Sequence, residues 1–224
     1  MKKEIKLFIF DMDGLMFDTE PISAQCWQAA AAQFGYDVPD EAFFAVLGMN
    51  QITAGDVFRR FLGSDFPYET VRRVKLAYQE RYYQEHDIPV KAGLEQCLDY
   101  ARQKKIACAV ASSSPLVQIR YLLKKTGLLP YFTLLQSGEE IAHGKPAPDI
   151  FLTACRHLSV APSQAVVFED SAIGLQAAHA ADIAAVWVPD LGTVPEDVAG
   201  AIWFRCASLA EVPQRLEREK EVIR

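Results

Sequence analysis

The sequence predicts an α/β fold, in which a doubly wound parallel sheet forms the core and a small α-helical domain is inserted into it. Apolar segments of strand length alternate along the chain with segments of helical periodicity, which is typical of a parallel sheet covered by helices on both faces. Residues 17–89 break this alternation because they contain only helical patterns. Acidic residues directly follow two of the apolar segments, at the strand ends where such sheets bind ligands.

The apolar segments predict the strands of a buried sheet. The first is Leu7–Phe10, an uninterrupted apolar run. The others, in chain order, are Ile106–Ala111, Phe132–Leu135, Val166–Phe168, Ala184–Val188 and Ile202–Phe204. The helical patterns that separate most of them, together with a last helix, span Gly93–Gln103, Pro115–Lys125, Pro146–Leu158, Ala172–Ala180 and Ser208–Val222.

The inserted segment, residues 17–89, is expected to form a helical cap domain, and residues 1–16 and 90–224 the α/β core domain. Because the insertion directly follows the first strand, we expect it to sit above the ligand-binding edge of the sheet. The two chain crossings, Leu15–Asp18 and Asp87–Gly93, would be hinges. Glycine and proline separate the helical patterns of the cap, which span Pro21–Phe34, Glu41–Leu47, Thr53–Leu62 and Tyr68–His86.

Length and composition are those of an ordinary globular protein, with 224 residues, 50% of them hydrophobic, and a net charge of −6. This charge, without a cluster of Lys or Arg, argues against a nucleic-acid partner. The first apolar run is too short for a secretory signal or a membrane span, so we expect a cytoplasmic protein with no membrane partner. A monomer is the default expectation for the oligomeric state. The five cysteines form no C-x-x-C pair and are predicted to be buried thiols.

Two acids, Asp11 and Asp13, follow the first strand in the stretch FIFDMDG. Alternate side chains of an extended chain point the same way, so both carboxylates should reach one small volume, where a cation must compensate them. A calcium loop also begins D-x-D-G, but the acids that it needs at later positions are missing here. The pair instead suits attack by one acid and proton transfer by the other.

Two further strand ends carry groups that suit a phosphate. Ser112 lies at the tip of the second strand in AVASSSP, where its hydroxyl and nearby backbone N–H groups would face the acids. Ser114 precedes Pro115 and is predicted to be a helix N-cap. In GKPAPD, the neighbouring glycine and proline are expected to hold Lys145 at a defined point of the same sheet edge.

The segment VVFEDS places Glu169 and Asp170 at the end of another buried strand. One acid there could simply cap the next helix, and Asp170 is placed to do so. Together with Asp11 and Asp13, the two acids make a hard oxygen site, which favours Mg²⁺ over softer metals. No His or Cys cluster with zinc spacing competes with it, and the four histidines are expected at the surface or its boundary.

These motifs, in the order D-x-D-G, Ser, Lys and Glu-Asp, resemble those of the haloacid dehalogenase-like hydrolases. The resemblance is to the phosphatase and sugar-phosphate mutase branch, which carries a helical cap after the first motif. The matching segments are FDMDGLMFDTE, VASSSP, GKPAPD and FEDSAIG, spread over nearly the whole chain. The resemblance implies a Rossmann-like core, Mg²⁺ as the cofactor and a small phosphorylated metabolite as the substrate.

The resemblance also implies residue roles. Asp11 would be the nucleophile that forms an aspartyl-phosphate, and Asp13 the general acid for the leaving alcohol and then the base for water. Ser112 and Lys145 would hold the phosphoryl oxygens. Asp13 argues against dehalogenation, since a halide leaving group needs no proton. The metal ligands would be Asp11, Asp13 through its backbone carbonyl, Asp170, and Glu169 directly or through water.

The cap is expected to select the substrate by closing over the site. In related β-phosphoglucomutases a cap His and a cap Arg engage the substrate, and Ser23 and Gln51 stand at the corresponding positions here. Neutral Gln51 cannot bind a second phosphate as a guanidinium does, so we favour a phosphatase, acting on a phosphosugar, over a mutase. A non-catalytic phosphometabolite-binding protein is the remaining alternative.

Three cap residues, Thr19, Gln51 and Lys75, are candidates for substrate contacts. Lys75 lies with Arg72 and Arg73 on the last predicted cap helix. Because one face of that helix must be solvated, the simpler expectation for each of these three cations is an exposed surface position.

Overall fold

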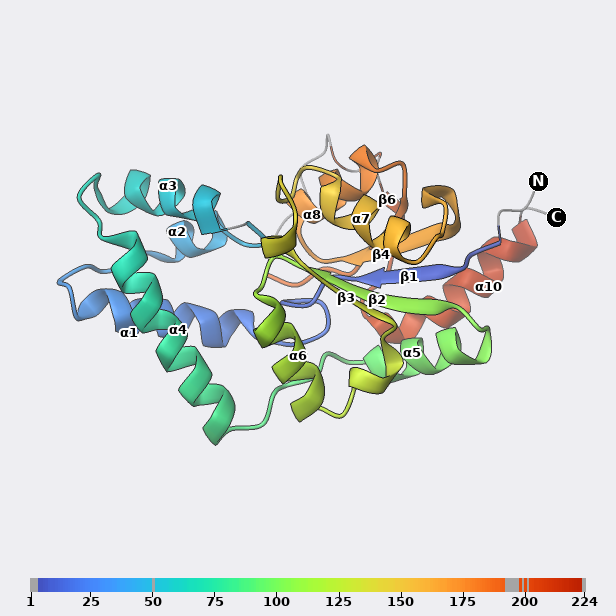
Figure 1. Cartoon of the computed structure of the whole chain (residues 1–224), viewed down its shortest axis with the longest axis horizontal. Coiled ribbons are helices and arrows are strands. Elements are labelled where there is room, and N and C mark those ends of the chain that lie inside the picture. Colours follow the sequence, from blue (N-terminus) through green and yellow to red (C-terminus); the bar gives the residue numbers. More distant parts are fainter. Residues whose placement is uncertain (1–3, 50, 192–197, 199, 201, 223–224) are drawn as a thin grey trace.

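The computed structural model describes residues 4–49, 51–191, 198, 200 and 202–222 (Figure 1). One six-stranded sheet has the order β3-β2-β1-β4-β5-β6, and every neighbouring pair is parallel. The predicted doubly wound parallel sheet is therefore confirmed. The strands are β1 Leu7–Phe10, β2 Ala107–Ser112, β3 Leu134–Ser137, β4 Ala165–Glu169, β5 Ala184–Trp187 and β6 Ile202–Arg205.

Helices cover both faces of the sheet because alternate β1 side chains point to opposite sides. Phe8 and Phe10 pack in the apolar cluster of α5, α6 and α10, whereas Leu7 and Ile9 pack with α7 and α8. Figure 1 shows these two groups of helices on opposite faces of the sheet. These helices are α5 Leu94–Gln103, α6 Leu116–Lys125, α7 Asp149–His157, α8 Ala172–Ala180 and α10 Val212–Val222. The short 3₁₀ helices are η1 Leu129–Tyr131, η2 Gly138–Glu140, η3 Pro162–Gln164 and η4 Leu209–Glu211.

Four helices between β1 and α5 lie beyond the carboxyl ends of the strands (Figure 1), and we call them the cap helices. They share an apolar cluster around Trp27, Phe58 and Tyr68. The flanking residue Phe17, however, belongs to the same cluster as β1, so the division of the chain at residues 16/17 and 89/90 stays a prediction. The cap helices are α1 Glu20–Ala32, α2 Asp40–Phe44, α3 Gln51–Leu62 and α4 Tyr68–Glu85.

Some element boundaries differ from the prediction. Strand β3 extends to Ser137 because Gln136 and Ser137 are buried although they are polar. Helix α7 begins at Asp149 rather than Pro146, because the preceding residues form a turn in which the Ala147 N–H donates to the Gly144 carbonyl over 3.0 Å.

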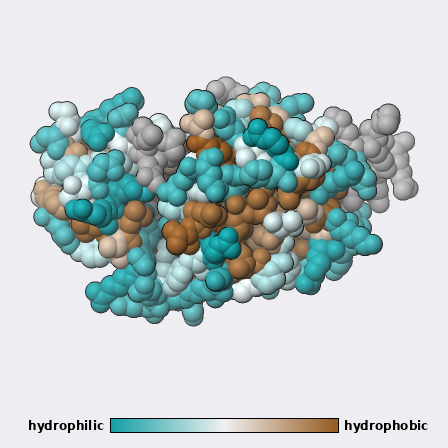
Figure 2. Space-filling view, viewed as in Figure 1, coloured by the Kyte–Doolittle hydropathy of each residue, from teal (hydrophilic) through white to brown (hydrophobic). Residues whose placement is uncertain are grey.

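The cysteines and histidines lie where the sequence analysis predicts. All five cysteines are buried and free, and all four histidines are exposed. Figure 2 shows a mostly hydrophilic outer surface on the cap helices, with hydrophobic residues gathered over the middle of the molecule. Within the described part of the chain, no helix combines the length and apolar character that a membrane crossing requires.

Candidate active site

The carboxyl end of β1 opens the site. The Asp11 N–H donates to the Phe168 carbonyl over 3.1 Å, so sheet pairing continues one residue past β1. Met12 is fully buried in the core cluster, whereas Asp11 and Asp13 line a pocket. The extended backbone thus sends both acids to one side, as expected. At Gly14 the chain turns with φ +81°, where a Cβ would come within 2.4 Å of the Asp170 Oδ2.

Lys145 bridges acids from two strand ends. Its Nζ lies 2.5 Å from Asp11 Oδ1 and 2.5 Å from Glu169 Oε1, and its side chain is 1% exposed. Burial alone would lower the pKa of Lys145, but the two carboxylates raise it above that of a free lysine. The ammonium therefore stays charged and neutralises part of the buried acid cluster.

The end of β4 supplies the other two acids. Glu169 is fully buried, and its Oε2 accepts from the Ser171 N–H at 3.2 Å and the Ser171 hydroxyl at 3.0 Å. Ser171, rather than Asp170, is the N-cap of α8, with its Oγ accepting from the Gly174 N–H at 3.2 Å. The capping explanation of Asp170 is therefore wrong.

Asp11, Glu169 and Asp170 bring one carboxylate oxygen each within 4.8 Å of one another. Asp170 Oδ1 is buried and has no hydrogen-bond partner among the described residues, an arrangement that costs free energy unless a ligand compensates it. Burial, with further contributions from nearby acids, raises the pKa of Asp11 to about 7 and that of Asp170 well above its usual range. This oxygen-only set fits a hard divalent cation; the Asp13 side chain lies outside it.

Two hydroxyl groups hold the Asp13 carboxylate. Thr19 Oγ1 donates to Oδ1 over 2.6 Å and Ser114 Oγ donates to Oδ2 over 2.8 Å. The predicted N-cap role of Ser114 is wrong, since the N-cap of α6 is Pro115. Thr19 is 1% exposed, and its hydroxyl is directed at Asp13, so its contact with a substrate stays a prediction.

Ser112 lies at the end of β2, is 1% exposed and lines the pocket. Its Oγ accepts from the Ser114 N–H over 3.1 Å. A hydroxyl group has one hydrogen to donate, and no described residue accepts it from Ser112, so a ligand in the pocket could. The site thus combines groups from the ends of three adjacent strands, β2, β1 and β4.

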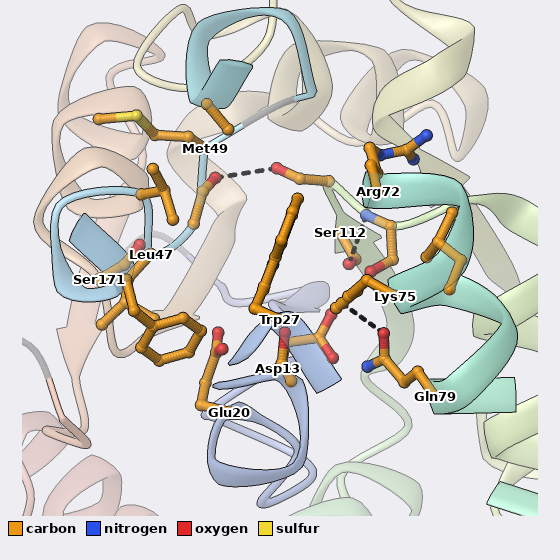
Figure 3. Close-up of a pocket in the computed structure, with 18 of the residues that line it drawn as sticks. Asp13, Glu20, Trp27, Leu47, Met49, Arg72, Lys75, Gln79, Ser112 and Ser171 are labelled. Atoms are coloured by element: carbon orange, nitrogen blue, oxygen red, sulfur yellow. Dashed lines mark hydrogen bonds between the residues drawn. The ribbon is translucent and has the colours of Figure 1, made fainter. Parts of the chain in front are cut away.

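Residues of the cap helices also line the pocket, and several of them are polar (Figure 3). In this view Asp13 lies between Glu20 of α1 and Lys75 of α4. Lys75 is 8% exposed and donates to Gln79 Oε1, and its Nζ lies 5.9 Å from the centre of the Trp27 ring. The simpler expectation of a surface position is wrong for Lys75, whereas Arg73 is exposed and Arg72 lines the pocket.

Burial shifts the pKa values of Lys75 and Glu20, the two charged groups that the cap helices bring near Asp13. Loss of water lowers the pKa of Lys75 to about 8, although Glu20 and Asp13 oppose this shift. Loss of water also raises the pKa of Glu20 to about 8, and Asp13 adds to that effect. Glu20 escaped the sequence analysis because an acid in the first turn of a helix is usual there.

Loop residues of the cap also meet the core. The Ser113 hydroxyl donates to the Gly48 carbonyl over 3.0 Å. Gly48 has φ +74°, and a Cβ there would lie 2.9 Å from Ser171 Oγ. Ser23 lines the pocket, whereas the side chain of Gln51 lies outside what the structure describes.

The chain is similar in sequence to named phosphatases and in structure to a solved protein. A phosphorylated carbohydrates phosphatase of Thermotoga maritima is 28% identical over 179 residues, which cover 80% of this chain and 82% of that protein. The fructose-1-phosphate phosphatase YqaB of Escherichia coli is 29% identical, with coverages of 80% and 93%. The crystal structure of CbbY from Rhodobacter sphaeroides in complex with phosphate matches with a TM-score of 0.82 and 27% identity, covering 93% of this chain and 96% of that chain.

The family model described as haloacid dehalogenase-like hydrolase matches residues 8–188. This range runs from β1 to the end of β5 and therefore includes each of the four motifs as well as the cap helices. The resemblance inferred from the motifs is confirmed. The chain belongs to the haloacid dehalogenase-like hydrolase family.

Proposed function

We propose that the protein is a Mg²⁺-dependent phosphatase that hydrolyses a phosphorylated carbohydrate through an aspartyl-phosphate at Asp11. The observation that carries the proposal is the buried cluster of Asp11, Lys145, Glu169 and Asp170, of which Asp11 and Asp170 line the pocket. Such a cluster has no structural necessity, since buried acids destabilise a fold unless they are compensated. It suits the binding of a cation next to a nucleophile.

Asp11 and Asp170 would hold the metal ion, together with the Asp13 carbonyl, and Glu169 would join them directly or through water. When bound, Mg²⁺ neutralises charge on the transferring phosphoryl group. The orphaned Oδ1 of Asp170 supports this assignment. Lys145 adds a positive charge next to Asp11, which lowers the pKa of Asp11 against the effect of burial and so favours the ionised form that attacks.

In the first step, an Asp11 oxygen forms a bond to phosphorus while the bond from phosphorus to the alcohol oxygen breaks. Asp13 in its acid form gives its proton to the departing oxygen. In the second step, the Asp13 carboxylate takes a proton from water, whose oxygen attacks phosphorus and releases Asp11. Thr19 and Ser114 suit both steps because a hydroxyl can donate to a carboxylate or accept from a carboxylic acid.

Phosphoryl oxygens would be held by Ser112 and Lys145. The leaving alcohol would then lie toward the cap helices, where Glu20, Lys75 and Gln79 offer donors and acceptors. Such groups suit the hydroxyls of a carbohydrate, and two relatives are named for phosphorylated carbohydrates or fructose 1-phosphate. Cytoplasmic location, a monomeric state and a cap domain spanning residues 17–89 stay predictions.

The proposal is tested with purified protein, p-nitrophenyl phosphate and a panel of sugar phosphates. Phosphate release should require Mg²⁺ and stop with EDTA; activity undiminished by EDTA contradicts metal dependence. Conversion of β-glucose 1-phosphate to glucose 6-phosphate without net phosphate release would identify a mutase instead. Stabilisation by phosphate esters without any turnover would identify a binding protein.

A further inference from the structure

The strongest unassigned group is the carboxylate of Asp190, in the loop after β5. Its side chain is 10% exposed. Oδ1 accepts from Lys91 Nζ over 2.6 Å. Oδ2 is buried and has no hydrogen-bond partner among the described residues, so half of this carboxylate lacks a donor.

Asp190 Oδ2 lies near Asp170, one of the proposed metal ligands. A Cβ at Gly14 would lie 3.1 Å from Asp190 Oδ2 and 2.4 Å from Asp170 Oδ2. Both carboxylates therefore approach the same side of Gly14. Asp170 Oδ1 likewise has no hydrogen-bond partner among the described residues, so each of these two neighbouring acids has one oxygen that lacks a donor there.

A hydrated divalent cation would satisfy both acids in different ways. Mg²⁺ binds few carboxylates directly and usually keeps several waters. Those waters have hydrogens to donate, and a carboxylate oxygen that cannot reach the ion can accept one. Asp190 does not belong to the group of acids whose oxygens lie within 4.8 Å of one another, which suits an outer position.

We propose that Asp190 is a positioning residue, whose Oδ2 accepts a hydrogen bond from a water of the bound divalent ion while Lys91 holds Oδ1. The inference rests on the proposed function, because it needs the metal.

Lys91 can hold Asp190 in place because Lys91, in the second chain crossing, is itself held by contacts with the first crossing. Its N–H donates to the Met16 carbonyl over 2.9 Å, and its Nζ lies 3.6 Å from Asp18 Oδ1. A residue of the second crossing thus contacts two residues of the first. The carboxylate of Asp190 is fixed by these contacts before any ion binds.

The test compares Asp190→Asn with Asp18→Asn by titration calorimetry of the metal-free protein with Mg²⁺. Both variants lose one acid next to Lys91, but Asp18 is 46% exposed, and the three atoms nearest to a Cβ at Gly14 belong to Asp170 and Asp190. We expect the Kd for Mg²⁺ to rise about tenfold in Asp190→Asn and to stay within about twofold in Asp18→Asn. The rise in melting temperature on adding Mg²⁺ should shrink in parallel.

An unchanged Kd in a folded Asp190→Asn variant overturns the inference and leaves the proposed function intact. Failure of the unchanged protein to bind Mg²⁺ overturns the metal dependence itself. If Asp190→Asn does not fold, Asp190→Glu replaces it, because this variant keeps a charge for Lys91 but displaces the carboxylate by one methylene. A Kd equal to that of the unchanged protein then counts against the inference, and a severalfold rise supports it.

Discussion

The pocket has two chemically different sides. On the core side, Lys145 contacts both Asp11 and Glu169 at 2.5 Å, and the two acids lie at the ends of parallel strands. On the cap side, Glu20 and Lys75 come from helices, Lys75 lies beside the Trp27 ring and Gln79, and both groups have pKa values shifted to about 8. The core side is a cluster of acids around one buried lysine, whereas the cap side holds one acid and one lysine that both titrate near pH 8.

This difference indicates a division of labour. Strand register fixes the core groups relative to one another, because neighbouring β1, β2 and β4 residues are locked by backbone hydrogen bonds. The cap groups lie on helix faces, which are held by side-chain packing, by the Gly48 contact and by hydrogen bonds from Tyr121 and Lys125 of α6 to the Tyr83 carbonyl of α4. We expect changes on the core side to abolish chemistry and changes on the cap side to alter which substrate binds.

Asp11→Asn should have the largest effect. An amide is a poor nucleophile, so we expect kcat to fall by about 10⁴-fold or more and the phosphoryl adduct to disappear from mass spectra of acid-quenched enzyme. The control is Asp182→Asn, at an exposed acid between α8 and β5, which should keep its activity. A folded Asp11→Asn variant with substantial turnover would remove Asp11 from the nucleophile role.

Lys75→Met tests the cap side with a smaller expected effect. Loss of a buried cation should lower kcat/KM for a sugar phosphate by about 10- to 100-fold, and less for p-nitrophenyl phosphate, which lacks the sugar hydroxyls. Arg73→Met is the matched control, because it removes an exposed cation from the same helix. Equal losses for both substrates would show that Lys75 does not select the alcohol.

Gly48→Ala should weaken the contact between cap and core. Both Gly48 and Gly35 have positive φ, but a Cβ meets Ser171 and Ile173 at Gly48 and nothing within 4 Å at Gly35. The backbone penalty of about 1 kcal/mol should therefore appear in both alanine variants as lost unfolding free energy. We expect only Gly48→Ala to lower kcat/KM, by about fivefold. Equal kinetics in the two variants would argue against a functional contact.

The pH dependence of KM should show the smallest effect. As pH rises through about 8, Lys75 loses its positive charge and Glu20 gains a negative one, so both changes make the pocket more negative. A phosphate ester carries negative charge, and its KM should therefore rise about threefold or more between pH 7 and 9. The double variant Glu20→Gln/Lys75→Met should lack this rise. A slope that persists in the double variant would place the titration elsewhere.

Sequence reasoning worked where chemistry is tied to strand ends. An apolar run followed by D-x-D marks both the strand and the direction of its acids, and Met12 is buried between them as alternation requires. Sequence reasoning was wrong where a residue fits a local role but makes a contact with a distant residue instead. Ser114 looked like a helix cap because it precedes Pro115, yet its hydroxyl donates to Asp13, a residue distant in the sequence.

By itself, the sequence determined the parallel sheet, the strand ends that carry acids and the family, because these depend on local periodicity and on motifs whose order a parallel sheet brings to one edge. Only the tertiary structure decided which helical residues of the cap enter the pocket, and that Asp190 lies beside Gly14. A helix turns every side chain outward in some direction, and only packing against other elements decides which direction is the interior. A single acid in a loop likewise acquires its surroundings from segments far away in the chain.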